Sequence, residues 1–453
     1  MPYIGRDTDK LSNVEVLDNI TFDGSSSYTL QKGGSNFTPS SANTLLVSID
    51  GVVQAGNFTV SGSTIDFGTA VAGTSTCNFI LHYGIGLITT PSDGSVTEAK
   101  IGTGAVTSAK LASGAVPNQS AFKNIIINGD MSIAQRGTSF TGNTTGHYIV
   151  DRFALNINGA IGTWTTSQDS NVPTGQGFTK SLKIDCTTAD ASPAAADFVI
   201  VQQRFEGQML QYLKKGTANA ESLTASFWVK SNKTGTYIAE LEDRDNSRYI
   251  SQSYTISSAD TWEKKTVTFL GDTTGAFDND NAQSLRLNFW VGAGATWSSG
   301  TLGTTWHTTS ANRAVGQVNL ADSTSNEFYI TGVQLEVGSA ASDFEFLPYD
   351  VNLQRCQRYF EQIVSPSAFN IYWSGYTDSN YDDTSPYSFK VEKRTVPSAS
   401  ATSGFTFSNI NGSEFDFAQK NKSSINFIWT TNGAGRYYVY SGSGDKIKFD
   451  AEL

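Results

Sequence analysis

Cysteine and histidine, the residues of most metal sites and many catalytic sites, are scarce in this sequence. Its 453 residues include three of each. The histidines (His82, His147 and His307) are isolated from one another, and the sequence contains no HExxH motif, zinc-type spacing or GxSxG elbow. The glycine-rich stretch at 292–303 lacks the lysine of a phosphate-binding loop. We therefore expect no enzyme and no required cofactor.

The cysteines also say something about the compartment in which the chain is made. Cys77, Cys186 and Cys356 are odd in number and far apart, unlike the closely spaced pairs of a disulfide framework. We predict that all three are reduced and buried. Synthesis in a cytoplasm is then more consistent with the sequence than secretion into an oxidising space.

Charged residues and long apolar runs are also few. Charged residues make up 16% of the chain, and the formal net charge of −11 argues against a nucleic-acid groove, which needs clustered cations. No run approaches the length of a membrane span, and the opening MPYIGRDTDKL has no apolar signal-peptide core. We expect neither a nucleic-acid partner nor membrane insertion.

The residues that are abundant favour strands. Hydrophobic residues reach 38%, and many of the remaining positions are glycine, serine, threonine or asparagine, which suit tight turns. A chain of this length should form two to four domains. The predicted fold is mainly β, with an N-terminal small β domain, a repeat stalk, an antiparallel jelly-roll sandwich, a short helix and a C-terminal β tip.

The period of the apolar positions changes within residues 327–363. Val333, Leu335 and Val337 alternate with polar residues, as in a half-buried strand. A helix is then predicted over 351–363, because apolar residues recur three and four positions apart. These residues are Leu353, Cys356, Phe360 and Ile363. Such a stripe could pack against a sheet or form a seam between chains. A helix that only caps its own sandwich fits equally well.

Two segments precede the sandwich. Residues 1–85 contain short β-like runs, and Asp50-Gly51 between two of them indicates a hairpin. Residues 86–123 contain a tandem repeat, VTEAKIGTGA (96–105) followed by VTSAKLASGA (106–115), with six of ten positions identical. Units this short gain stability only by stacking or by association between chains. The alternative is a flexible linker.

The sandwich is predicted over 124–350 and the tip over 364–453. Alternating strands at 223–229 and 285–291, with turn signals between such runs, indicate an antiparallel sandwich. The tip is rich in aromatic residues, and apolar sugar faces stack on such rings. The candidate glycan-binding residues are Trp373, Tyr376, Asp378, Asn380, Tyr381, Asp382 and Tyr387. Secondary candidates are Trp297, Trp306 and His307. In both groups the rings could instead belong to a core.

Several of these segments resemble bacteriophage tail fibres and tail-associated adhesion proteins. The resemblance rests on four patterns: VQLEVGS..S.FE..PY...L..CQRYFE (333–361), LLVSIDGVVQAGNFTVSGSTIDF (45–67), the VT.AK(I/L) repeats and Asp151-Arg152-Phe153. The closing segments resemble the fibre C-terminal pattern, although Lys393-Arg394 stands where fibres usually have Met-Arg. The middle domain also resembles jelly-roll carbohydrate-binding modules.

The resemblance implies a virion protein of the tail, made in the bacterial cytoplasm and assembled as a parallel homotrimer. Residues 1–85 would attach to tail adaptor or tail tube proteins, and the distal part would bind a host surface glycan. The likeness to binding modules also implies that a structural calcium could lie near Asp130 and Glu336. Two other functions remain open: a virion-borne glycan depolymerase, and a head fibre or capsid decoration subunit that binds no receptor.

Overall fold

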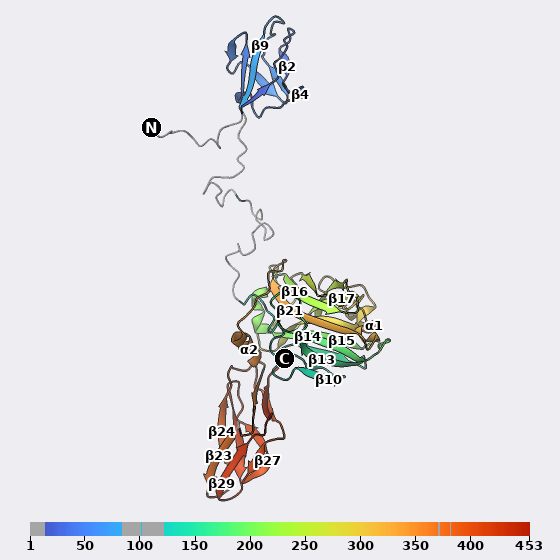
Figure 1. Ribbon diagram of the computed structural model, residues 1–453, viewed down its shortest axis with the longest axis vertical. Helices are drawn as coiled ribbons and strands as arrows, with labels where there is room; N and C mark the ends of the chain where they lie inside the picture. Colours follow the sequence, from blue (N-terminus) through green and yellow to red (C-terminus); the bar gives the residue numbers. More distant parts are fainter. Residues whose placement is uncertain (1–13, 84–100, 102–121, 370–371, 381) are drawn as a thin grey trace, which may run out of the picture. The chain divides into compact units, whose positions relative to one another are not determined.

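The computed structural model describes residues 14–83, 101, 122–369, 372–380 and 382–453. The chain divides into two compact units, Met1–Ala112 and Ser113–Leu453. Both consist mainly of antiparallel strands (Figure 1), which confirms the predicted fold class. Apart from Ile101, the decapeptide repeat lies outside the described residues. Within the described ranges, no helix is long and apolar enough to span a membrane.

The first unit is a small β domain. Its elements are β1 (Val14–Leu17), β2 (Ser27–Thr29), β3 (Gln31–Lys32), β4 (Ser35–Asn36), the 3-10 turn η2 (Ala42–Thr44), β5 (Leu45–Ile49), β6 (Val52–Gln54), β7 (Thr59–Ser61), β8 (Thr64–Asp66) and β9 (Cys77–Tyr83). The main sheet has the order β1-β9-β5-β6. Its hairpin between β5 and β6 turns at Asp50 and Gly51, both with positive φ, as the sequence predicts.

The larger unit begins with a sandwich of two six-stranded sheets. Its strands are β10 (Ser139–Asn143), β11 (His147–Tyr148), β12 (Ala154–Asn158), β13 (Thr163–Asp169), β14 (Ser181–Thr188), β15 (Phe198–Glu206), β16 (Leu223–Ser231), β17 (Gly235–Asp243), β18 (Arg248–Ile256), β19 (Glu263–Phe269), β20 (Gln283–Ala293) and β21 (Glu327–Val337). Short helical elements lie in its loops: η5 (Gly207–Met209), η6 (Gln211–Leu213), α1 (Ala295–Ser298), η7 (Ser310–Asn312) and η8 (Leu320–Asp322).

The strand orders define a jelly roll. One sheet runs β10-β13-β14-β21-β16-β19 and the other β11-β12-β15-β20-β17-β18. At each position the two sheets hold strands that are neighbours in the sequence, such as β14 with β15 and β21 with β20. The chain therefore winds as a double layer rather than completing one sheet before the other.

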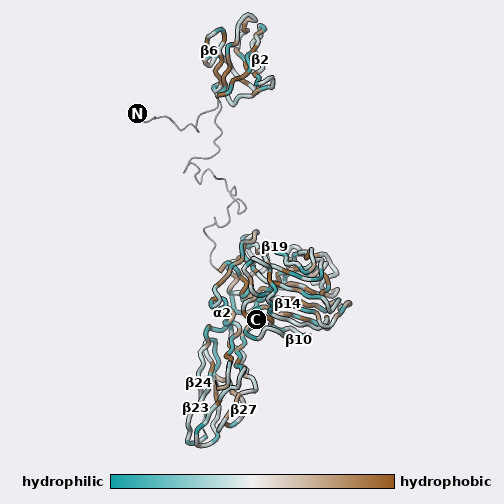
Figure 2. The backbone as a smooth tube through the Cα atoms, viewed as in Figure 1, coloured by the Kyte–Doolittle hydropathy of each residue, from teal (hydrophilic) through white to brown (hydrophobic). Residues whose placement is uncertain are grey.

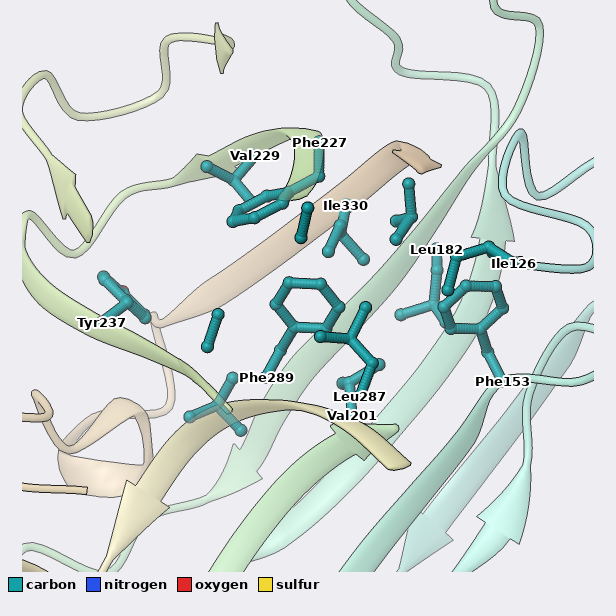
Figure 3. Close-up of a cluster of buried hydrophobic side chains, with 14 of the residues drawn as sticks. Ile126, Phe153, Leu182, Val201, Phe227, Val229, Tyr237, Leu287, Phe289 and Ile330 are labelled. Carbon is teal, nitrogen blue, oxygen red and sulfur yellow. The ribbon is translucent and has the colours of Figure 1, made fainter. Parts of the chain in front are cut away.

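The sandwich core follows from alternation along the strands. In β16 and β20 every second residue is apolar and faces the opposite sheet, and hydrophobic positions recur along the strands (Figure 2). Figure 3 shows Phe227, Phe289 and Leu287 meeting between the sheets. The rings of Phe227 and Phe289 pack edge to face with centroids 4.9 Å apart.

The predicted helix over 351–363 is too long. The helix α2 spans Tyr349–Gln357, and Phe360 and Ile363 lie in the strand β22 (Phe360–Val364), which pairs with β30 (Lys446–Asp450). The apolar spacing of three and four residues continues across this boundary, but backbone pairing with β30 determines the conformation beyond it. Cys356, at 0% exposure, packs with Ile127 and Ile133, and Leu353 is partly buried beside them. Cys356 and Phe360 are buried within one chain, Leu353 and Ile363 are partly exposed, and a seam between chains stays a prediction.

A buried network of charged groups joins the sandwich to the C-terminal domain. Arg358 donates two hydrogen bonds to the carboxylate of Glu206, at 2.8 and 2.7 Å, and the hydroxyl of Tyr359 donates to the same group at 2.5 Å. The guanidinium of Arg152 lies 3.5 Å from the ring centroid of Tyr359 and pairs with Glu452. Buried charges persist only when paired in this way. The residue pattern Asp151-Arg152-Phe153 thus has a structural role at the joint.

The C-terminal domain is a small sandwich of nine strands. After β22 come β23 (Tyr372–Thr377), β24 (Asp382–Ser388), β25 (Ser398–Ala401), β26 (Thr406–Ser408), β27 (Ile410–Ala418), β28 (Ser424–Thr431), β29 (Gly435–Tyr440) and β30. They form three three-stranded sheets, β22-β30-β25, β23-β29-β26 and β24-β28-β27. Ile425, Phe427, Val439, Ile447 and Phe449 are the most deeply buried side chains of the core that these sheets share.

Candidate functional site

One layer of the C-terminal domain presents a continuous outer surface. The sheets β22-β30-β25 and β23-β29-β26 follow each other along the same three columns, because Ser365 and Phe369 keep the first column hydrogen-bonded to the second at Asp445 and Ser441. We call the outward side of this layer the tip face. Its residues are Gln362, Val364, Phe369, Tyr372, Ser374, Tyr376, Ser398, Ser400, Thr406, Ser408, Arg436, Tyr438, Tyr440, Lys446, Lys448 and Asp450.

Aromatic rings dominate the distal half of the tip face. Tyr376 is 77% exposed, Phe369 59% and Tyr372 50%. The ring of Tyr440 stacks on Phe369 with centroids 4.3 Å apart and on Tyr438 at 5.8 Å, which makes a column of three rings. Across the strands, the facing pairs are Tyr372 with Tyr440, Ser374 with Tyr438, and Tyr376 with Arg436. So many exposed rings on one sheet face mark an interaction surface.

Cations occupy the middle column of the same face. Along β30 and β29 the outward residues are Asp450, Lys448, Lys446, Tyr440, Tyr438 and Arg436. Arg436 is exposed, and the two lysines are half-buried. In the described part of the chain none of these three cations forms an ion pair. The face therefore combines stacked rings with unpaired positive charge.

Trp373 and Tyr387, two of the predicted binding residues, point into the domain instead. The indole N–H of Trp373 donates to Ser385 Oγ at 2.9 Å, and its ring packs against Phe427 at 5.2 Å. Tyr387 stacks on Phe449 and donates its hydroxyl to Glu361 at 2.6 Å. Burial, together with the hydrogen bond and charge of Glu361, raises the pKa of Tyr387. β23 and β24 alternate, and these two partly buried side chains have the inward parity, so both belong to the core of the domain. Their role in binding stays a prediction.

Two of the polar tip candidates hydrogen-bond within the domain. Asn380 Oδ1 accepts from the backbone N–H of Gly433 at 2.6 Å, and Asp382 Oδ1 accepts from the hydroxyl of Thr430 at 2.6 Å. Asp378 is exposed. Tyr381 lies outside the described residues. Of the predicted tip set, only Tyr376 is placed by the structure on the tip face.

Sequence reasoning missed most of the face. Phe369, Tyr438, Tyr440 and Arg436 were not among the candidates, although all four are on the sheet surface. The signal was available in GRYYVY (435–440), whose strict alternation puts Arg436, Tyr438 and Tyr440 on one side of a strand. Reading the aromatic residues by parity, rather than by density, would have selected them.

The secondary candidates close one end of the sandwich. Trp297 donates its indole N–H to the carbonyl of Ala196 at 3.1 Å and packs beside Trp290. The indole of Trp306 donates to the carbonyl of Leu270 at 2.6 Å. The ring of His307 accepts from the N–H of Thr309, and burial together with the nearby charges of Arg313 and Arg248 lowers its pKa. Each ring is thus tied to its own domain.

The proposed calcium ligands hydrogen-bond to separate groups. Asp130 accepts from Ser132 and Asn352, whereas Glu336 accepts from Gln334 and from the backbone and hydroxyl of Ser342. Among the residues that the structure describes, no group of three or more His, Cys, Asp or Glu side chains could hold a metal ion. Bound calcium stays a prediction.

The carboxylates that could have formed a hydrolytic pair are engaged elsewhere. Glu240, at 0% exposure, receives two hydrogen bonds from Arg313, at 2.7 and 2.8 Å. Glu242 pairs with Arg313 at 3.2 Å and with Arg244 at 2.8 Å. Burial raises the pKa of Glu240, while the neighbouring arginines hold the pKa of Glu242 below its usual value despite burial. These groups hold the loop around Arg313 on the sheet.

Comparisons with known proteins add a likeness of fold. No protein-family model matches the chain, and no curated protein matches it. Among solved structures, the enzymatically active domain of tailspike protein 4 from bacteriophage CBA120 matches over 48% of this chain and 22% of its own, with 14% identity and a TM-score of 0.27. TmCBM61, solved with beta-1,4-galactotriose, matches over 48% and 99%, with 8% identity and a TM-score of 0.25.

A family 11 carbohydrate-binding module from Clostridium thermocellum, solved with a beta-1,3-1,4-mixed-linked tetrasaccharide, matches over 45% of this chain and 98% of its own. Its identity is 11% and its TM-score 0.22. The family resemblance to phage fibres has no family match behind it and stays a prediction. The antiparallel sheets resemble those of jelly-roll carbohydrate-binding modules, and that likeness concerns the fold alone.

Proposed function

We propose that this protein is a bacteriophage tail-fibre subunit or a related adhesion protein whose tip face binds a host surface glycan. The column of exposed rings at Phe369, Tyr440 and Tyr438, with Tyr372 and Tyr376 beside it, is the observation that carries the glycan part. Pyranose rings present apolar C–H faces that stack on aromatic side chains. Serine and threonine hydroxyls on the same strands can bond to sugar hydroxyls. The phage part rests on the sequence resemblance.

We propose binding without hydrolysis. The carboxylates of Glu240 and Glu242 are held by arginine partners, and the tip face contains a single carboxylate, Asp450, which pairs with Arg136. Glycoside hydrolysis needs two such groups on either side of the scissile bond. A depolymerase remains the alternative, and release of reducing sugar from host envelope polysaccharide would identify one.

The test compares tyrosines on the tip face with an exposed tyrosine elsewhere on the protein. Tyr376→Ala and Tyr372→Ala should each weaken adsorption to host cells by about 5- to 30-fold, equivalent to ~1–2 kcal/mol for a lost stacking contact. Tyr212→Ala is the matched control, because Tyr212 is 51% exposed on the sandwich. Equal adsorption by the three variants would reject the tip face as the receptor site.

Attachment to the tail would fall to residues 14–83. On the outer side of the sheet β1-β9-β5-β6, Val16, Leu81 and Leu46 lie directly opposite one another, and Val16 is 65% exposed. An apolar sheet face of this kind favours docking on another protein. Val16→Lys should reduce incorporation into virions while leaving adsorption by the free protein unchanged. Gold labelling of capsids rather than tails would favour the head-fibre alternative.

We also propose a parallel homotrimer on the basis of the fibre resemblance. In the predicted stripe Cys356 and Phe360 are buried within the chain, which leaves the partly exposed Leu353 and Ile363 for contact with another chain. Three weak glycan sites in one particle would gain strength through avidity. Light scattering of the purified chain at micromolar concentration should give three times the chain mass, and a monomer would contradict the proposal.

A further inference from the structure

The positive charge of the tip face is local and contrasts with the rest of the chain. The net charge of the protein is −11, yet the tip face holds three cations, Arg436, Lys446 and Lys448, against a single carboxylate, Asp450, at the end of β30. Each cation is on the middle strand of the layer, and Lys446 lies opposite Val364 in register. Lys448 lies opposite Gln362 and Ser400, and Arg436 lies opposite Tyr376.

The two carboxylates nearest to these cations already have partners of their own. Asp445, at the junction of β29 and β30, is 7% exposed and accepts from the N–H of Gly442 and the hydroxyl of Thr402. Asp450, at the end of the column next to the sandwich, pairs with Arg136 at 3.1 Å. Asp450 shares the outer side of β30 with Lys446 and Lys448, but its ion pair is with Arg136, so the face keeps an excess of positive charge. Keeping like charges on neighbouring outward positions is slightly unfavourable unless an anion joins them.

We propose that the ligand of the tip face is an acidic glycan, an extended polymer whose sugars carry carboxylate groups. This inference rests on the proposed function, because the same face supplies the stacking rings. Strands rise about 3.3 Å per residue, so Arg436 and Tyr440 are ~13 Å apart along the column and the lysines lie further along it. A single sugar cannot span that distance. A polysaccharide lying along β29 and β30 would meet Arg436 first, then the rings of Tyr438 and Tyr440, and then the two lysines.

A polymer of modest charge density fits better than a nucleic acid. Three cations could neutralise few phosphates, whereas strong nucleic-acid binding uses many contacts. The surrounding protein is negative and would repel a dense polyanion over the Debye length. A polysaccharide with one carboxylate in every one or two sugars exposes less charge and more apolar ring face.

The experiment uses the full chain and a matched pair of probes, polygalacturonate and its carboxyl-reduced neutral counterpart, together with a wider array of acidic and neutral polysaccharides. We expect acidic polymers to bind more tightly than their reduced forms, and their affinity to fall several-fold between about 50 and about 300 mM NaCl. Arg436→Gln, Lys446→Gln and Lys448→Gln should each weaken acidic binding by about two- to five-fold. Lys420→Gln, a change at an exposed loop lysine of the same domain, should have no effect.

The outcomes separate the two proposals. If reduced and acidic polymers bind equally and the three cation variants bind like the parent, the ligand is neutral and only the present inference fails. If no polysaccharide on the array binds and Tyr376→Ala still adsorbs to cells normally, the proposed function fails with it. Equal affinity for a single-stranded oligonucleotide of matched charge would show a general polyanion surface and overturn the assignment to a glycan.

Discussion

The ammonium group of Lys215 is surrounded by oxygen atoms, as a bound metal ion would be. Replacing this lysine therefore tests how the sandwich is stabilised. The ammonium lies 2.5 Å from Asp243 Oδ2, 3.1 Å from Asp272 Oδ2, and 3.0 and 2.7 Å from the carbonyl oxygens of Thr274 and Gly275. The lysine side chain is 5% exposed, and the two carboxylates are 0% and 3% exposed. Four oxygens thus surround one buried cation.

Removing that cation should lower the free energy of unfolding substantially. Lys215→Ala leaves the carboxylate of Asp243 buried without its cation, and breaking a buried ion pair from one side costs ~3–5 kcal/mol. Arg248, which bonds to Asp272 at 2.7 Å, compensates only for that second carboxylate. For a domain of this size the loss corresponds to a melting temperature lower by about 6–20 °C. Tryptophan fluorescence can follow the transition, since the ring of Trp306 lies 5.4 Å from the ammonium.

The loss of stability caused by Lys215→Ala should also depend on pH. Burial raises the pKa of Asp272, but hydrogen bonds from Arg248 and from the N–H of Thr274, with the charge of Lys215, hold the pKa below its usual value. A carboxyl with a depressed pKa stabilises the fold above its unfolded-state pKa, near about 4, and the contribution is lost as the pH falls through its folded pKa. The difference between Lys215→Ala and the parent should therefore shrink below about pH 4.

Calcium offers a second readout. The variant would expose two carboxylate and two carbonyl oxygens, which are the ligands that Ca²⁺ prefers, and a contraction of a few tenths of an ångström would bring them to about 2.3–2.6 Å from the ion. Millimolar Ca²⁺ should raise the melting temperature of Lys215→Ala and not that of the parent. The matched control is Lys214→Ala, because Lys214 is 54% exposed in its pair with Glu221 and an exposed pair contributes ~0–1 kcal/mol. Equal melting temperatures for the two variants would refute the reasoning.

Two further predictions concern buried side chains. Trp373→Ala should unfold the C-terminal domain, with a loss of ~3–5 kcal/mol, because the ring packs against Phe427 and Trp429. Circular dichroism should show this unfolding. The control variant Tyr376→Ala should keep the spectrum of the parent. Burial raises the pKa of the thiols of Cys77, Cys186 and Cys356, that of Cys186 to about 11, so a thiol reagent near pH 8 should label the native chain slowly and all three thiols on denaturation. Rapid labelling of the native protein would contradict the burial of the thiols.

Where a strand had a clean alternation, the sequence was enough to predict its inner side. Val333 and Leu335 in β21 and Phe227 in β16 are all at 0% exposure, on the inner side that their parity predicts. The prediction of a half-buried strand is wrong for β21, because its other side is buried too, with Gln334 at 0% and Glu336 at 6% exposure. Trp290 lies between Phe289 and Val291, so alternation puts it on the other side of β20 from the core. It is nevertheless at 0% exposure, because Phe198 and Arg313, both far from it in the sequence, pack around it. Local pattern sets the side of the strand, and a remote segment sets the burial.

The end of α2 could not be read from apolar spacing. Cys356, Phe360 and Ile363 keep intervals of four and three residues through a change from helix to strand, since both conformations can bury those positions. The choice is made by β30, whose residues Lys446–Asp450 pair with Val364–Phe360 in register. A contact between residues more than eighty positions apart in the chain leaves no mark in the local sequence.

The net charge of the whole chain likewise says little about any one surface. A total of −11 argues against a nucleic-acid groove, but a total does not state where charges lie. Much of the positive charge of the larger unit is neutralised inside it, as in the pairs of Arg313 with Glu240 and Arg358 with Glu206. Arg436, Lys446 and Lys448 are left on one column by the parity of two strands and by the pairing that joins them. The electrostatic character of the face is thus a property of strand register, and it becomes visible only once the register is known.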